Sequence, residues 1–313
     1  MIEILNILYL LSFLSILLSN FFLINYFQDK IGIKKFTLMD IFSINLLTIM
    51  FVLLILSFFE LNLLIILLIF FILALLSLLF SFNSKINIYK NFSFDYLLFY
   101  IFCLILSVDL VANLKLEWDG HGWYFHALNF RENHNFFNLE NFLRNNHPHL
   151  GGILWGLLWK LSFVDNEYFG RIFFIVIYVI SITAVSSAIS KKKINKVLVS
   201  SFLILITHDR FLFGGYQEIL MFSLIAIIIN FTHRLNLSEL SWSQLFFIFL
   251  FSSLLLWIKN EGVFFFGIIL SYLFFYLQIK KKIALLFLGF FVIILKIYLI
   301  SLNSSTDINI LNS

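Results

Sequence analysis

The chain has 313 residues, of which 62% are hydrophobic and only 12% are charged. A soluble globular protein has about 25% charged residues, and with a mean hydropathy of +1.01 this chain carries more apolar surface than one water-soluble core could bury. The composition therefore excludes a soluble domain, and the single cysteine, Cys103, excludes a disulfide scaffold. The net charge of +4 does not indicate nucleic-acid binding, because the basic residues fall in separate loops. The sequence predicts an all-α polytopic membrane protein.

The apolar runs predict about ten transmembrane helices, measured against the roughly 20 residues that a helix needs to cross the hydrocarbon. The first run carries Glu3 near its start and follows no basic residue, so it does not have the pattern of a cleaved signal peptide. No linker rich in Pro, Gly or Ser divides the chain, and residues 1–313 are expected to form a single membrane domain. In chain order the predicted spans are 2–26, 40–59, 61–82, 95–114, 169–190, 197–213, 217–232, 244–258, 262–279 and 283–302.

The lysine and arginine residues distinguish the two sides of the membrane, because cytoplasmic loops carry an excess of them. Thirteen of the 21 basic residues fall in one set of loops, mostly in tight runs such as 191–193 and 280–282. The opposite loops hold seven, scattered singly, and Lys296 lies inside the last predicted span. We therefore expect the lysine-rich loops to be cytoplasmic, in a multi-pass protein of the bacterial inner membrane.

The apolar run 150–163 is predicted not to cross the membrane. If it crossed, the lysine runs that follow would face outward, and its 14 residues are too few to span. A run of this length is typical of an interfacial or re-entrant segment, and its pattern suits an interfacial helix with Trp155 and Trp159 at headgroup depth. Residues 115–168 then form one long external loop containing interfacial helices. A narrow stripe of small or polar residues on this helix comprises His149, Gly152, Gly156 and Lys160.

The rare residue types gather in the predicted external segments. Loop 115–168 holds five of the seven histidines, four of the six tryptophans and the only proline. Two other external elements, 207–218 and 259–262, are also rich in polar residues and glycine, whereas the cytoplasmic loops offer little beyond Lys, Asn and Ser. The sequence therefore predicts that function resides on the outer face.

The external loop opens with acidic residues beside glycines. Glu117 and Asp119 directly follow a predicted span, so Asp119 is expected near the membrane interface. A carboxylate in such a low-dielectric position can act as a general base, because desolvation raises its pKa toward the working pH. Glycines on both sides of His121 allow the backbone to approach a ligand closely. The alternative is that the acidic pair only solvates a helix end.

Candidate ligand-binding residues follow in the other external elements. His147 and His149 flank Pro148; each can hold a phosphate or a hydroxyl, or can be an ordinary interface residue. Arg210 and Lys259 are suited to a phosphate, although Lys259 could instead pair with an acidic neighbour or extend to the headgroups. Further candidates in these elements are Asp209, Tyr216, Glu218 and Glu261.

Metal chemistry is not predicted. The histidines and carboxylates of the external segments could in principle hold a divalent metal such as zinc, but no spacing matches a recognised ligand pattern. We therefore predict no metal site and no required cofactor.

These features resemble the GT-C glycosyltransferases, whose best-known branches are the protein O-mannosyltransferases and the lipid A aminoarabinose transferases. The resemblance covers about residues 95–262, a GT-C-like core that follows three N-terminal helices in 1–94 and precedes C-terminal helices in 263–313. Its motifs are an acidic residue after a span, a His-Pro dipeptide opening an apolar helix, an aromatic-Gly-Arg sequence, and a Lys/Glu-Gly turn. Here these are Asp119, His147-Pro148, Phe169-Gly170-Arg171 and Lys259-Asn260-Glu261-Gly262.

The resemblance implies transfer of a sugar from a polyprenyl-phosphate donor to a lipid, glycan or protein acceptor on the outer face of the bilayer. Asp119 matches the position of the family's catalytic base, with Glu117 as the fallback. Arg171, Arg210 and Lys259 are candidates to stabilise the charge of the departing phosphate. Two alternatives stay open: a transporter or flippase of a lipid-linked sugar, and a non-catalytic membrane scaffold.

Overall fold

A computed structural model describes residues 2–25, 36–59, 61–80, 92–113, 115–116, 118–133, 135–136, 147–209, 212–235 and 237–304. Within these ranges the chain forms helices and no β-strand, which confirms the predicted all-α class. The first helices are α1 (Ile2–Leu17), α3 (Leu38–Leu56), α4 (Leu63–Phe80), α5 (Phe92–Asn113), α6 (Trp118–Arg131) and α7 (Leu150–Leu161). They are followed by α8 (Ile172–Ile189), α9 (Lys193–Thr207), α10 (Glu218–His233), α11 (Trp242–Ser253), α12 (Gly262–Tyr276) and α13 (Ile279–Ser304).

Six described helices are long and apolar enough to cross a membrane, which supports a multi-pass membrane protein. They correspond to the first five predicted spans and to the last one: Ile2–Asn25, Leu38–Leu56, Leu63–Phe80, Ser93–Ala112, Glu167–Ile189 and Ile279–Leu302. The other four predicted spans correspond to α9, α10, α11 and α12, whose helices have 12 to 16 residues. The predicted number of about ten spans is therefore not confirmed.

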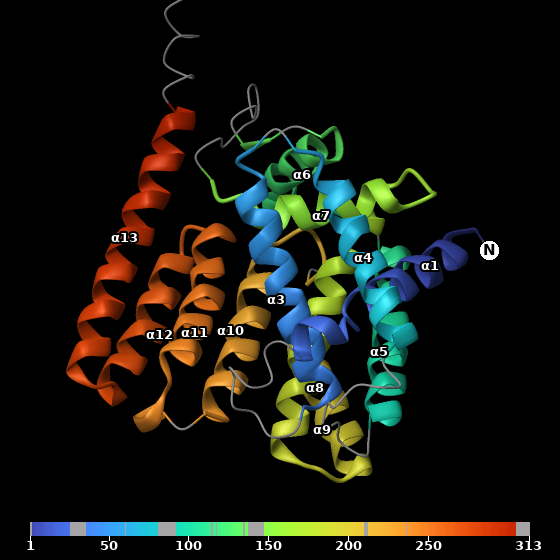
Figure 1. Cartoon of the computed structure of the whole chain (residues 1–313). Helices are drawn as coiled ribbons and strands as arrows, with labels where there is room; N and C mark the ends of the chain where they lie inside the picture. Colours follow the sequence, from blue (N-terminus) through green and yellow to red (C-terminus); the bar gives the residue numbers. More distant parts are fainter. Residues whose placement is uncertain are drawn as a thin grey trace, which may run out of the picture.

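The helices form one bundle with two distinct ends (Figure 1). α8 packs against α10, α9, α5 and α3, while α11, α12 and α13 extend the bundle to one side. We call the end that holds α6 and α7 the outer end, since the sequence predicts it to be external. The other end holds the lysine runs 191–193 and 280–282, and we call it the lysine-rich end.

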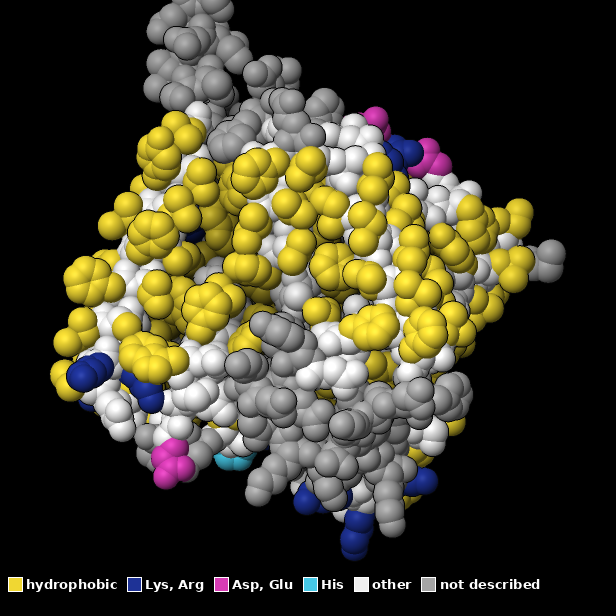
Figure 2. Space-filling model, in the orientation of Figure 1, with side chains coloured by type: hydrophobic (Ala, Val, Ile, Leu, Met, Phe, Trp, Pro, Cys, Tyr) yellow, Lys and Arg dark blue, Asp and Glu magenta, His cyan; other side chains and the backbone are white. Residues whose placement is uncertain are grey.

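Apolar side chains cover the flank of the bundle (Figure 2). In this view they form a broad band over the helices, and charged side chains lie near its upper and lower edges. Large apolar side chains that the helices expose include Ile69 of α4 and Phe287 of α13, which is 75% exposed. So much exposed apolar surface would be unfavourable in water but is the expected surface against lipid.

Helix α7 is buried inside the protein, which corrects the expected position of its tryptophans. Trp155 is 0% exposed and Trp159 is 6% exposed, so neither lies on an open surface at headgroup depth. The Nε1 of Trp155 donates to the carbonyl of Glu167 at 2.9 Å, and the Nε1 of Trp159 donates to Asp165 at 3.1 Å. These internal acceptors satisfy the indole N–H groups that an interfacial position would expose to water.

The stripe of small or polar residues on α7 is the face that packs against α6. A Cβ at Gly156 would lie 2.3 Å from the carbonyl oxygen of Ala127, and a Cβ at Gly152 would lie 2.6 Å from the Cβ of His126. Only glycine allows the two helices to approach this closely, as in small-residue packing within membranes. With its 12 residues, α7 is well below spanning length, in agreement with its predicted place inside loop 115–168.

Candidate functional site at the outer end

The segments predicted to be external meet around Arg171, at the start of α8. Its Nη1 donates to the carbonyl oxygens of Lys115, at 3.2 Å, and Phe213, at 2.8 Å. Its Nη2 forms an ion pair with Glu167 at 2.8 Å. The side chain is fully buried, so the guanidinium is enclosed by protein acceptors. Arg171 therefore joins the end of α5, the start of α8 and the loop before α10, which is a positioning role.

Two glycines bring the start of α6 onto the same loop. A Cβ at Gly120 would lie 2.3 Å from the carbonyl oxygen of Gly214, so the two backbones are in direct contact. Gly215 has a φ of +95°, a conformation that favours glycine, and it lies against Gly120 and Trp155. Asp119 precedes Gly120 in the first turn of α6, so its backbone lies beside this contact. The side chain of Asp119 is outside the described residues, as are Glu117 and Arg210.

Lys259 is paired with Glu218, the first residue of α10. The Nζ of Lys259 donates to Oε1 of Glu218, which confirms the alternative that this lysine pairs with an acidic neighbour. The pair is partly accessible, because the Glu218 side chain is 39% exposed and the Lys259 side chain is 17% exposed. Lys296 of α13 reaches the same turn, where its Nζ donates to Asn260 at 3.4 Å. Lys296, which lies inside the last predicted span, therefore contacts the turn before α12 at the outer end.

His149 lies in the protein interior rather than in an open site. Its Nε2 is 2.9 Å from the Oγ of Ser57, and its ring packs between Phe58, Phe136 and Trp257. Burial lowers the pKa of His149 well below its ordinary value, and the nearby His126 lowers it further. The imidazole is therefore neutral at pH 7 and is not an anion-binding cation.

The burial of His149 predicts an acid-sensitive fold. A histidine whose native pKa lies below its unfolded value stabilises the protein above about pH 6.5, and that contribution is lost as pH falls further. We expect the thermal midpoint in detergent to fall between about pH 7.5 and about pH 5. The variant His149→Gln should show a smaller fall, whereas His233→Gln, at an exposed position, should behave like the wild type. An equal fall in the His149→Gln variant would contradict the assignment.

The other predicted site residues are spread around the outer end. His147 contacts the ring of Trp123 edge-on, with 5.8 Å between the ring centroids. His121 lies in α6, Asp209 follows α9, and Glu261 precedes α12; all three are exposed, while Tyr216 is half-buried in the loop before α10. No group of three or more His, Cys, Asp or Glu side chains in the described ranges is arranged to hold a metal ion.

Three residues at this end were not predicted. Asp109, inside the span 95–114, lies 3.2 Å from the Nε2 of His208. Glu167 forms the ion pair with Arg171, and Gln217 is fully buried, with its Nε2 donating to the carbonyl oxygen of Gly215 at 3.3 Å. The sequence could have indicated Asp109 as a site residue, because it is an acidic residue within an apolar span and such residues seldom face lipid.

Comparison with known proteins does not identify this chain. No protein-family model, no curated protein and no solved structure matches it. Its function is therefore inferred from its own residues.

Proposed function

We propose that this protein is a membrane glycosyltransferase that uses a polyprenyl-phosphate sugar donor. The acceptor would be a lipid, glycan or protein at the outer face of the bacterial cytoplasmic membrane. The observation that carries the proposal is the convergence at the outer end. There the first turn of α6, which contains Asp119, touches the loop 212–217, and Arg171 ties that loop to α8.

The chemistry requires a base for the acceptor and a cation for the leaving group. Asp119 would accept the proton from an acceptor hydroxyl, whose oxygen attacks the anomeric carbon of the sugar. The bond between that carbon and the phosphate oxygen breaks, and the electron pair leaves with the polyprenyl phosphate. Lys259, held by Glu218, would stabilise the phosphate charge, with Arg210 as a second cation. The proposal requires no metal.

The location of the residues suits a lipid-linked donor. A polyprenyl chain stays in the bilayer, so its phosphate must be met near headgroup depth by residues at the end of the bundle. Glu218 is the first residue of α10 and Lys259 lies just before α12, a helix that exposes large apolar side chains such as Phe264 and Ile268. A groove of about 510 Å³ between α12 and α13, lined by Asn260, Val263 and Lys296, opens beside the same turn.

The proposal is tested with the purified protein in liposomes that carry a radiolabelled polyprenyl-phosphate sugar. We expect the label to move to an acceptor, and polyprenyl phosphate to be released in equal amount. A nucleotide sugar in the aqueous phase should not serve as donor. If the labelled lipid crosses the bilayer with its sugar bond intact, the protein is a flippase and the glycosyltransferase proposal is wrong.

A further inference from the structure

Lys296 is a buried cation on α13, a helix whose surface is mostly apolar and exposed. The lysine is 4% exposed, whereas Leu295 and Ile297 beside it are 39% and 62% exposed. Its Nζ donates to the Oδ1 of Asn260, in the turn before α12, at 3.4 Å. It therefore does not extend over the surface to the headgroups, as a lipid-facing lysine would. An ionisable group buried in a membrane span usually faces a cavity, a partner or a ligand.

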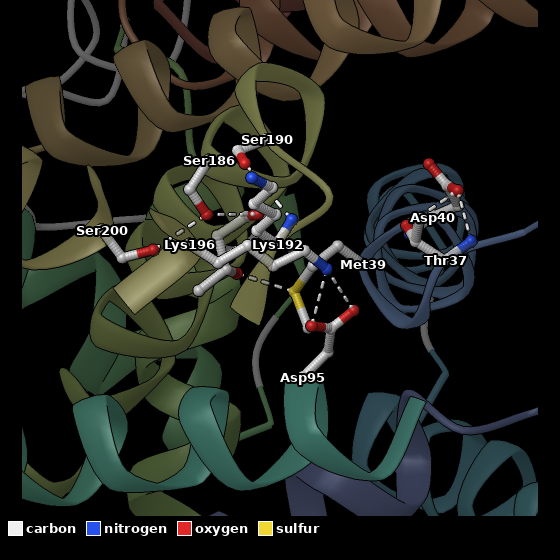
Figure 3. Close-up of polar contacts among 10 residues, drawn as sticks. Thr37, Met39, Asp40, Asp95, Ser186, Ser190, Lys192, Lys196 and Ser200 are labelled. Atoms are coloured by element: carbon white, nitrogen blue, oxygen red, sulfur yellow. Dashed lines mark hydrogen bonds and ion pairs between the residues drawn. The ribbon is translucent and has the colours of Figure 1, made fainter. Parts of the chain in front are cut away.

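The other two buried Lys or Arg side chains of the described ranges each contact a carboxylate. Arg171 has its ion pair at the start of α8. Lys196 of α9 donates to both carboxylate oxygens of Asp95 in α5, at 2.8 and 2.9 Å (Figure 3). No described carboxylate lies within ion-pair distance of Lys296; the charge of Glu261 acts on it from farther away, and that side chain is exposed to water. A buried ammonium group held by a neutral amide is unfavourable, and an anionic ligand would compensate its charge.

A groove of about 510 Å³ opens beside Lys296, between α12 and α13. Its apolar wall consists of Val263, at the start of α12, and three isoleucines of α13, Ile293, Ile297 and Ile300. Counted from the first isoleucine, the others lie at i+4 and i+7 and the lysine lies at i+3, so all four share one helix face. The groove therefore offers an apolar strip for a hydrocarbon chain, with a cation beside it for a charged end.

The place of Lys296 along α13 suits a lipid of the outer leaflet. The helix begins beside the lysine run 280–282 at the lysine-rich end. At 1.5 Å per residue, Lys296 is about 21 Å along the helix from Lys282. The hydrocarbon core is about 30 Å thick, so in a bilayer that α13 crosses Lys296 lies toward the outer headgroups. A lipid phosphate on that side is within its reach.

The charge released by the proposed transfer distinguishes one lipid from the others. In a polyprenyl-phosphate sugar the phosphate is a diester with about one negative charge, and it is a diester in phosphatidylglycerol too. The polyprenyl phosphate that leaves is a monoester, with about 1.5 to 2 charges at neutral pH. Lys259 is already paired with Glu218. Lys296 reaches the same turn and is available to balance the charge that the leaving group gains.

We propose that Lys296 and this groove bind the polyprenyl phosphate that leaves in the proposed reaction. The phosphate lies at Lys296 and Asn260, and the first isoprene units lie along the isoleucines of α13. The inference rests on the proposed glycosyl transfer and adds to it a binding residue for the leaving group and the path of its lipid chain.

The test measures binding of polyprenyl phosphate, without any sugar, to the intact protein. The protein is placed in nanodiscs of phosphatidylcholine, the lipid is titrated, and bound molecules are counted by native mass spectrometry. Polyprenol, which lacks the phosphate, and phosphatidylglycerol are titrated in the same way. Lys296→Met removes the charge and keeps an unbranched side chain. Its matched control, Lys280→Met, removes an exposed lysine at the opposite end of the same helix.

A second pair of variants fills the groove without changing any charge. Ile297→Trp adds bulk to the groove wall, and Ile294→Trp adds the same bulk to α13 outside that wall. Both isoleucines are 62% exposed, so neither substitution should disturb the packing of the bundle.

We expect Lys296→Met to weaken binding of polyprenyl phosphate at least about tenfold, the lower end for a hydrogen bond to a charged group, and to leave binding of polyprenol unchanged. Its thermal midpoint in detergent should not fall, because no carboxylate loses a partner. Ile297→Trp should weaken binding of both lipids. Lys280→Met and Ile294→Trp should bind like the wild type.

The proposal is overturned if Lys296→Met keeps the wild-type affinity for polyprenyl phosphate. It is also overturned if phosphatidylglycerol binds as tightly, because the groove would then take any anionic lipid, or if Lys280→Met loses as much, because binding would then follow overall charge. If Lys296→Met is destabilised, Ile297→Trp decides, and wild-type binding by that variant overturns the proposal. Because the probe carries no sugar, Lys296-dependent binding without transfer in liposomes would refute the glycosyl transfer and support this site, whereas transfer with Lys296-independent binding would refute this site alone.

Discussion

Replacing Asp119 with asparagine is expected to reduce sugar transfer by roughly 10²- to 10⁴-fold, the usual contribution of a general base. The amide has nearly the shape of the carboxylate but does not accept a proton at neutral pH. Because the contact between Gly120 and Gly214 is made by backbone atoms, the substitution should leave α6 in place. The rate of sugar transfer in liposomes should therefore fall, while the thermal midpoint in detergent should stay at the wild-type value.

The matched control for this substitution is Asp165→Asn. Asp165 lies at the same end, is 70% exposed and pairs with Arg131, so losing its charge should change transfer little. Glu117→Gln tests the fallback base. Normal turnover by the Asp119→Asn variant would refute the assignment of the base, and normal turnover by both acidic variants would refute acid–base catalysis by this pair.

Replacing Arg171 with leucine is expected to destabilise the protein by about 3–5 kcal/mol, the usual cost of removing one partner from a buried ion pair. Glu167 would keep a partly buried carboxylate without its cation, and the carbonyls of Lys115 and Phe213 would lose their donor. Arg171→Lys should restore only part of the stability, because an ammonium group cannot reproduce the planar fork of donors. The measurement is the thermal or denaturant midpoint in detergent.

A double substitution tests whether the ion pair carries this effect. When Arg171→Leu is combined with Glu167→Gln, the second change should cost less than it does alone, because no buried charge is then left unpaired. Additive costs would show that the two residues do not act together. A wild-type midpoint in the Arg171→Leu variant would contradict the positioning role, because the three segments would then be held by other contacts.

The membrane class followed from composition, and the prediction that α7 does not span the membrane followed from its length and from the lysine runs. Both depend on amounts that can be counted along the chain: apolar residues per segment and basic residues per loop. The same counting picked out the segments predicted to be external, which Arg171 and Gly120 bring together. It could not show which of those residues touch.

Contacts between side chains were decided by the tertiary structure. Helices that are apolar on every side, such as α8, have no polar face to show how they are rotated in the bundle, so their neighbours cannot be read from periodicity. For that reason the stripe containing Gly152 and Gly156 was recognised, but its partner α6 was not. The pairs Asp95–Lys196 and Asp40–Arg234 join residues more than a hundred positions apart, and only folding brings such charges together.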